Sequence, residues 1–210
     1  MSYLPQPTQG DFTPPPAGTF PAICYRVIDL GQQKSEYNGE AKVQHKVLLS
    51  WEIADEDERM PDGRPFTVSS RYTWSMHEKA ALRKDLEAWR GKAFEPTDFG
   101  QGGFDIRRLI GAPCMLSLVE TKKGDRTYTN ISGISKMPKS MTCAPLVNPT
   151  VYLWLERDLF DHQAFATLSD NLRATIMGSP TYVEMMRGSG APNGGHATDR
   201  HDDMNDDIPF

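Results

Sequence analysis

Acidic and histidine side chains are the first candidates for catalytic chemistry in this chain. Residues 55–58 read Asp-Glu-Asp-Glu, a run that could offer a nuclease carboxylates for a divalent metal ion. Four neighbours in one loop point in different directions, however, and such runs are usually solvated. The five histidines form no His-Glu-x-x-His pair and have no cysteine at metal-ligand spacing, and the chain lacks a phosphate-binding P-loop or a Gly-x-Ser-x-Gly motif. The residues therefore predict no metal site and no cofactor, and favour a binding protein over an enzyme.

Basic and aromatic side chains on the polar faces of strands and in loops offer a different chemistry. Proteins that coat single-stranded nucleic acid combine a basic groove with aromatic rings on which bases stack. The groove predicted here contains Lys34, Tyr37, Lys42, Lys46, Arg71, Lys122, Lys123, Arg126 and Tyr128. Trp51, Tyr72 and Trp74 have the opposite parity on their strands, which predicts that they pack in the core.

The last five residues are Asp206, Asp207, Ile208, Pro209 and Phe210. A solubilising tail gains nothing from exposing Ile and Phe, so this segment is predicted to be a ligand for another protein. Phe210 would enter a pocket, its α-carboxylate would pair with an Arg or Lys, and the aspartates would meet a basic rim. Burial of Ile208 and Phe210 contributes about 1.5–3 kcal/mol each before ordering costs, which predicts weak, exchangeable binding.

Period-2 alternation and turn residues indicate the elements that must position these groups. Five strands are expected over residues 19–29, 43–53, 66–74, 114–120 and 126–135, with a polar loop over 31–42. A helix is expected over residues 76–90, opened by a capping box of Ser75 and Glu78 and closed by Gly91, and a helical turn over 105–109. The order β-β-β-α-β-β is that of the OB-fold, a five-stranded, partly open barrel that binds oligonucleotides or oligosaccharides. A small β-barrel of another type remains an alternative fold at this point.

Composition divides the chain into four parts. Residues 1–17 form a Pro-rich leader, 18–139 the mainly β barrel domain, 140–187 an appended helical segment, and 188–210 a Gly-rich flexible tether with the acidic tip. The helical segment is expected to hold two short helices within residues 151–177, broken near 168–169, and to pack on the barrel. Of the net charge of −5, −4 belongs to the last 23 residues, while residues 18–139 carry +2. With no membrane span, no secretory signal and three unpaired cysteines, a cytoplasmic protein is expected.

The ending DDIPF resembles the C-terminal tip of bacterial single-stranded DNA-binding proteins. Two further stretches, LIGAPCMLSLVETKKGDRTYTNISGISKMPK (109–139) and FDHQAFATLSDNLRATIMGSPTY (160–182), are similar to phage or prophage members of that class. The resemblance implies a protein that protects single-stranded DNA during replication, recombination or repair in a bacterial host. It also implies that Ile208, Pro209 and Phe210, assisted by the aspartates, dock onto host enzymes of DNA metabolism. The N-terminal strand sequence of the bacterial cellular protein is missing, so its tetramer is not carried over and homo-oligomerisation stays open.

Two other functions stay open from the residues. One is an interaction module that sequesters host repair or replication enzymes through the tip without binding DNA, which the near-neutral barrel favours. The other is a nuclease that uses residues 55–58, which divalent-ion-dependent cleavage of labelled DNA would reveal.

Overall fold

The computed structural model describes residues 13–37, 40–124 and 126–187, without the side chains of residues 35–37, 40, 123 and 126. Its strands are β1 (Gly18–Tyr37), β2 (Glu40–Ile53), β3 (Thr67–Thr73), β4 (Pro113–Lys123), β5 (Arg126–Ser135) and β6 (Val151–Leu153). Its helices are α1 (Ala81–Arg90), α2 (His162–Ala166), α3 (Asp170–Met177) and α4 (Pro180–Arg187), with 3-10 turns η1 (Pro96–Asp98) and η2 (Ile106–Leu109). Within these ranges no helix is long and apolar enough to cross a membrane.

One sheet joins the six strands in the order β3-β2-β1-β4-β5, with β6 beside β1. Neighbouring strands are antiparallel except for β6, which runs parallel to β1. The register of β1 against β2 shifts between Cys24 and Arg26 and again between Asp29 and Gly31, and such bulges bend a strand. The first part of β1 can therefore pair with β4 and its middle with β6. Because no ladder joins β3 to β5 in the described ranges, the sheet is not closed.

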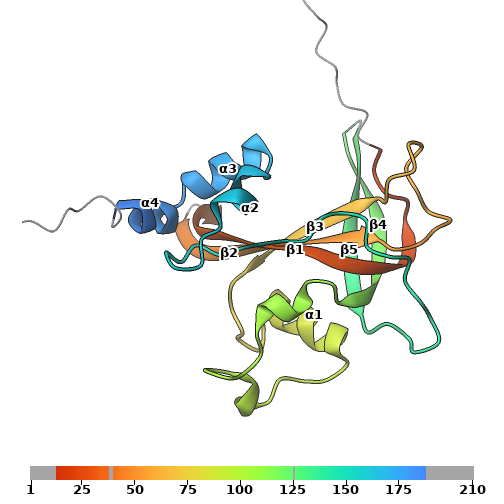
Figure 1. Cartoon of the computed structure of the whole chain (residues 1–210), viewed down its shortest axis with the longest axis horizontal. Helices are drawn as coiled ribbons and strands as arrows, with labels where there is room; N and C mark the ends of the chain where they lie inside the picture. The colour runs from red at the N-terminus through yellow and green to blue at the C-terminus, as the bar shows by residue number, and fades with distance from the viewer. Residues whose placement is uncertain (1–12, 38–39, 125, 188–210) are drawn as a thin grey trace, which may run out of the picture.

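Apolar side chains cover both faces of the central strands. Alternating residues of β2 from Val47 to Ile53, Trp51 among them, are buried on the face that packs against α1 and η2. The opposite face carries Ile28, Leu30 and Leu48, which pack against β6, α2, α3 and α4. Figure 1 shows this layering, with α1 on one side of the sheet and α2 to α4 on the other. The burial of Trp51 and Tyr72, at 0% and 5% exposure, confirms their predicted place in the core.

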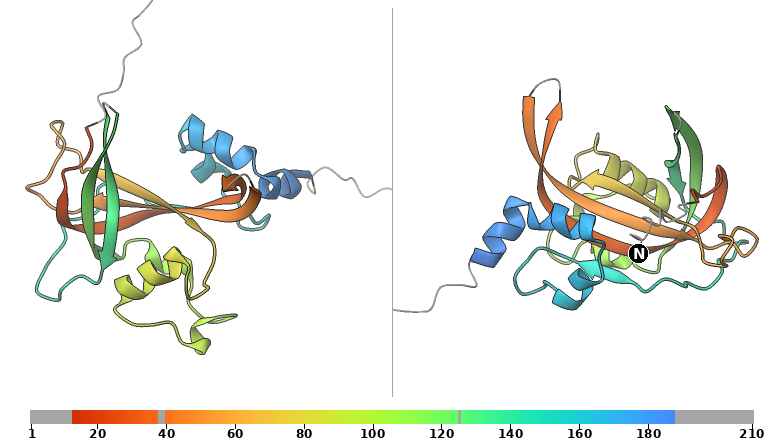
Figure 2. Two further views of the ribbon diagram at one scale, coloured as in Figure 1. Left: turned by 180° about the vertical axis from the view of Figure 1, so that it is seen from behind. Right: turned by 90° about the horizontal axis from the view of Figure 1, so that it is seen from above.

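The predicted loop over residues 31–42 is wrong, because most of it is strand. β1 continues to Tyr37 and β2 begins at Glu40, with Lys34 opposite Val43 in the ladder. This part of the hairpin is polar, so period-2 hydrophobicity could not reveal it, and the ladder hydrogen bonds extend the strands without it. Figure 2 shows this hairpin and the β4–β5 hairpin projecting to the same side in the view from above. The expected turn at residues 38–39 lies outside the described residues.

The helix expected over residues 76–90 begins only at Ala81. The Ser75 hydroxyl accepts a hydrogen bond from the backbone N–H of His77, which closes a local turn instead of a capping box. The expected end is confirmed, since Gly91 follows the helix with φ 65, the left-handed conformation that favours glycine there.

The appended segment is only partly helical, contrary to the prediction for residues 151–177. Val151–Leu153 is a strand, because these residues find backbone partners on β1 opposite Arg26, Val27 and Ile28. The break near residues 168–169 is confirmed, as α2 ends at Ala166 and α3 begins at Asp170. Pro180 begins α4, a position where the missing N–H of proline costs nothing.

Candidate nucleic-acid interface

The structure brings Lys46 and Arg71 onto one face of the β2–β3 pair. Lys46 lies opposite Thr73 in the ladder and Arg71 opposite Leu48, two positions further on. Arg71 is exposed, whereas Lys46 is half-buried and donates hydrogen bonds of 2.8 Å to Thr73 Oγ1 and Gln44 Oε1. Burial and the neighbouring charge of Lys42 lower the pKa of Lys46. This pair is a modest basic patch, and one of its cations already holds local partners.

The β4–β5 hairpin does not gather its predicted residues on one surface. Tyr128 is 44% exposed and lies opposite Thr121, on the face where Asn130 donates to Thr121 Oγ1 at 3.2 Å. Lys122 pairs opposite Thr127 and therefore occupies the other face of the hairpin. The backbones of Lys123 and Arg126 pair with each other near the tip, and their side chains lie outside the described residues.

The β1–β2 hairpin carries the remaining predicted cations. Lys34 is exposed and lines a hollow of about 680 Å³ between β1 and α4, together with Gln33, Glu184 and Arg187. Lys42 is exposed on β2, and the side chain of Tyr37 lies outside the described residues. The predicted groove is thus distributed over two hairpins and one face of the β2–β3 pair.

Four rings that were not predicted as a group meet around Trp154, and we call them the Trp154 cluster: His45, Trp74, Tyr152 and Trp154. The ring centroid of Trp154 lies 6.0 Å from that of Tyr152 with an interplanar angle of 1°, and 5.0 Å from that of Trp74 in an edge-to-face arrangement. His45 stacks on Trp154 at 6.3 Å. Both offset-parallel and edge-to-face geometries are favourable for aromatic pairs. The cluster is therefore an ordered array of π faces.

A buried carboxylate holds two sides of the Trp154 cluster in place. Asp29, at 1% exposure, accepts hydrogen bonds from the backbone N–H of Gly31 at 2.7 Å and, through Oδ2, from that of Leu155 at 3.3 Å. Its Oδ1 also lies 2.6 Å from His45 Nε2. Asp29 thereby ties the histidine ring on β2 to the chain that follows Trp154.

A second buried carboxylate anchors the segment that leads into β6. Glu52, at 0% exposure, accepts hydrogen bonds from the backbone N–H groups of Val147 and Asn148, both at 2.8 Å. The amide of Asn148 donates a third bond of 2.7 Å to Glu52 Oε2. These bonds fix residues 147–148 beside Glu52 of β2, a few residues before β6 begins at Val151.

Trp74 does not pack in the core as predicted. Its side chain is 37% exposed, because β3 ends at Thr73 and the chain turns away beyond the core. Its backbone N–H donates to the carbonyl of His45 at 2.8 Å, which keeps the ring beside the end of the sheet. His45, the neighbouring ring, keeps 31% of its side chain exposed.

Tyr152 and Trp154 are not among the predicted site residues, because the sequence predicts helices within residues 151–177. The alternation of buried Val151, Leu153 and Leu155 with half-buried Tyr152 and Trp154 is a period-2 pattern and could have identified a strand.

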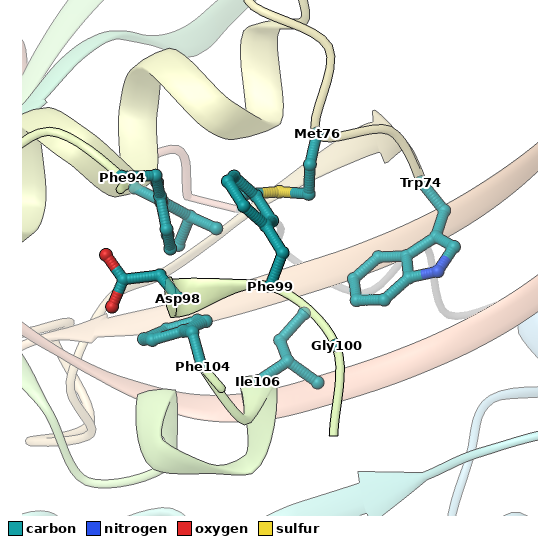
Figure 3. Close-up of a pocket in the computed structure, with 9 residues that line it drawn as sticks. Trp74, Met76, Phe94, Asp98, Phe99, Gly100, Phe104 and Ile106 are labelled. Carbon is teal, nitrogen blue, oxygen red and sulfur yellow. The ribbon is translucent and has the colours of Figure 1, made fainter. Parts of the chain in front are cut away.

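An apolar pocket of about 180 Å³ adjoins Trp74. Figure 3 shows Trp74 on one side of it, Phe94, Asp98 and Phe104 on the other, and Phe99 between. The guanidinium of Arg90 lies 4.2 Å from the ring centroid of Phe94, and Arg90 also bonds Asp98 at 3.2 Å. The pocket therefore extends the aromatic surface without adding an uncompensated charge.

Arg107 of η2 lies near Tyr152, one ring of the Trp154 cluster. Arg107 and Arg108 are exposed, and Arg107 forms a forked ion pair with Asp105. Burial raises the pKa of Tyr152, while the nearby positive charge of Arg107 acts in the opposite direction. The Tyr152 ring thus lies within electrostatic reach of a cation.

The remaining predicted residues fall into two groups. The acidic run at residues 55–58 lies in a loop, and across the described part of the chain no three His, Cys, Asp or Glu side chains are placed to hold a metal ion. The tip, Asp206 to Phe210, and the tether before it lie outside the described residues. No protein-family model matches this chain, and a comparison with curated proteins finds no match either.

Proposed function

We propose that this chain is an OB-fold protein that binds single-stranded DNA with little sequence preference and is not an enzyme. The observation that carries the proposal is the strand order β3-β2-β1-β4-β5, with α1 between β3 and β4. An OB-fold barrel opened between its third and fifth strands has this order, and such barrels bind oligonucleotides.

The two long hairpins support the proposal. An OB-fold grips its ligand with the loops between strands 1 and 2 and between strands 4 and 5. Here those hairpins carry Lys34, Lys42 and Lys122, all exposed, and the exposed ring of Tyr128. Lysines neutralise phosphates and rings stack on bases, which is the combination that sequence-tolerant binding needs.

The tip gives the proposed protein a second role. On the resemblance of Asp206 to Phe210 to the bacterial tip, it recruits enzymes of DNA replication, recombination or repair in the bacterial cytoplasm. An 18-residue tether, residues 188–205, has a root-mean-square reach of roughly 23 Å if it behaves as a flexible coil. Loss of binding to a purified bacterial DNA-metabolism enzyme on deletion of Phe210 is the expected result, and unchanged binding would remove this role.

The test of DNA binding is a titration of the full chain with labelled oligo(dT) and with a duplex of matched length, followed by fluorescence anisotropy. A preference for the single strand is expected, with log affinity falling by about 0.7 per neutralised phosphate for each unit of log salt. Absence of binding at low salt, both for the full chain and for one truncated before Asp199, would overturn the proposal. The function would then rest on the tip alone, as in an interaction module that sequesters host enzymes without binding DNA.

A further inference from the structure

The Trp154 cluster lies on the opposite face of β2 from Lys46. His45 shares its face with Val47, which belongs to the core beneath α1, whereas Lys46 shares the other face with Leu48. Tyr152 pairs beside Val27 of the same core. The cluster therefore continues the α1 side of the sheet beyond the closely packed interior.

We propose that the bases of a bound single strand stack on the Trp154 cluster, with Lys34 and Arg107 contacting the phosphates on either side. The inference rests on the function proposed above and assigns the bases to this face rather than to the face of Lys46 and Arg71.

The exposure and geometry of the rings support this assignment. Trp51 and Trp89 are 0% and 6% exposed, as expected for tryptophans that only fill a core, whereas Trp74 keeps 37% of its surface open. Tyr152 lies in β6 and Trp154 follows directly after the strand, with their ring centroids 6.0 Å apart and their ring planes parallel. Two parallel rings with a third ring beside them can receive successive bases.

The rings are positioned before any ligand arrives. Asp29 bonds the backbone N–H of Leu155 and the ring of His45, and Trp74 donates its backbone N–H to the carbonyl of His45. Rings that are already ordered lose little rotamer freedom on binding, which leaves more of the stacking energy for affinity.

Two cations lie near the cluster. Gln32 pairs opposite His45, and Lys34 follows two residues further along β1, about 7 Å beyond Gln32, where it lines the hollow against α4. The positive charge of Arg107 acts on Tyr152, so Arg107 lies near a second ring of the cluster. A strand whose bases meet the rings would bring its phosphates towards these two charges.

Intrinsic fluorescence tests the proposal without disturbing the protein. Since Trp51 and Trp89 are buried, oligo(dT) is expected to quench the emission of Trp74 and Trp154 and to shield them from iodide. In a Trp74→Phe/Trp154→Phe variant, which keeps aromatic faces, anisotropy should still report binding while the quenching disappears. Quenching that persists in this variant would overturn the proposal.

Affinity provides the second test, with an exposed apolar residue away from the cluster and from both hairpins as the control. Trp74→Leu should weaken oligo(dT) binding roughly 5- to 150-fold, the range for one lost stacked base, whereas Met177→Ala, at an exposed residue of α3 on the other side of the sheet, should change it less than 3-fold. Both side chains are exposed, so circular dichroism should show folded proteins. If the wild type binds and Trp74→Leu keeps its affinity, the stacking site is elsewhere and the proposed function stands. If the wild type itself fails to bind, the proposed function and this inference both fail.

Discussion

Replacement of Glu52 by glutamine should destabilise the fold. The two carboxylate oxygens of Glu52 accept three hydrogen bonds, from Val147 N, Asn148 N and Asn148 Nδ2. In Glu52→Gln one oxygen becomes an NH₂ group, which must face at least one of these N–H donors. The side chain is fully buried, so water cannot solvate the mismatched groups at its end.

The magnitude follows from the bonds that change. One buried donor left without an acceptor costs about 1–3 kcal/mol, and the two surviving bonds lose the strengthening that comes from a charged acceptor. Relief from burying a charge offsets part of this loss. A net loss of about 2–3 kcal/mol is expected, which corresponds to a fall in Tm of about 4–12 °C for a chain of this size.

Urea denaturation followed by far-ultraviolet circular dichroism measures this change. Glu56→Gln, in the exposed loop at residues 55–58, is the matched control and should alter the free energy of unfolding by less than about 0.5 kcal/mol. Asn148→Ala should couple to Glu52→Gln, so the double variant should lose less stability than the two single losses combined. Additive losses, or a Glu52→Gln effect no larger than that of Glu56→Gln, would refute the reasoning.

Three other outcomes follow from the same features. Gly31→Ala should lower the free energy of unfolding by about 1–3 kcal/mol, because Gly31 has φ +68 and an added Cβ would lie 2.6 Å from Ser179 Oγ. In the same urea assay Gly63→Ala should cost less, because Gly63 has φ +83 but an added Cβ there would meet open space. Burial raises the pKa of Cys24 from 9.0 to about 12, so the unfolded chain loses this proton first and the free energy of unfolding should fall between pH 9 and 12. The decrease in the free energy of unfolding over this pH range should be smaller in Cys24→Ala. An identical pH profile in that variant would contradict the role of the Cys24 thiol. Removal of residues 199–210 should raise affinity for oligo(dT) at low salt, because the acidic tail competes with DNA for the basic groups; an unchanged affinity would exclude this competition.

Local patterns were sufficient for the regular elements. Alternating apolar residues predicted the middle of β2 and the burial of Trp51, and the Arg126–Ser135 strand has the predicted bounds. Gly91 marked the end of α1 because a left-handed residue closes a helix there. These signals lie within a few residues of each other, so the chain alone contains them.

Features that depend on distant partners were decided only by the tertiary structure. Glu52 meets Val147 across 95 positions of sequence, and Asp29 meets Leu155 across 126, so neither buried carboxylate could be recognised from its neighbours. Strand β6 exists because β1 offers it backbone partners, and this pairing turns Tyr152 and Trp154 towards the same side as His45. The alternation of residues along the strand predicted that the Trp74 side chain faces the core. This alternation does not tell where the core ends, and Trp74 lies just beyond it. The amino-acid sequence determined the strands and their apolar faces, because hydrophobic periodicity is local; the place where aromatic rings and cations meet required the packing of segments more than 100 residues apart.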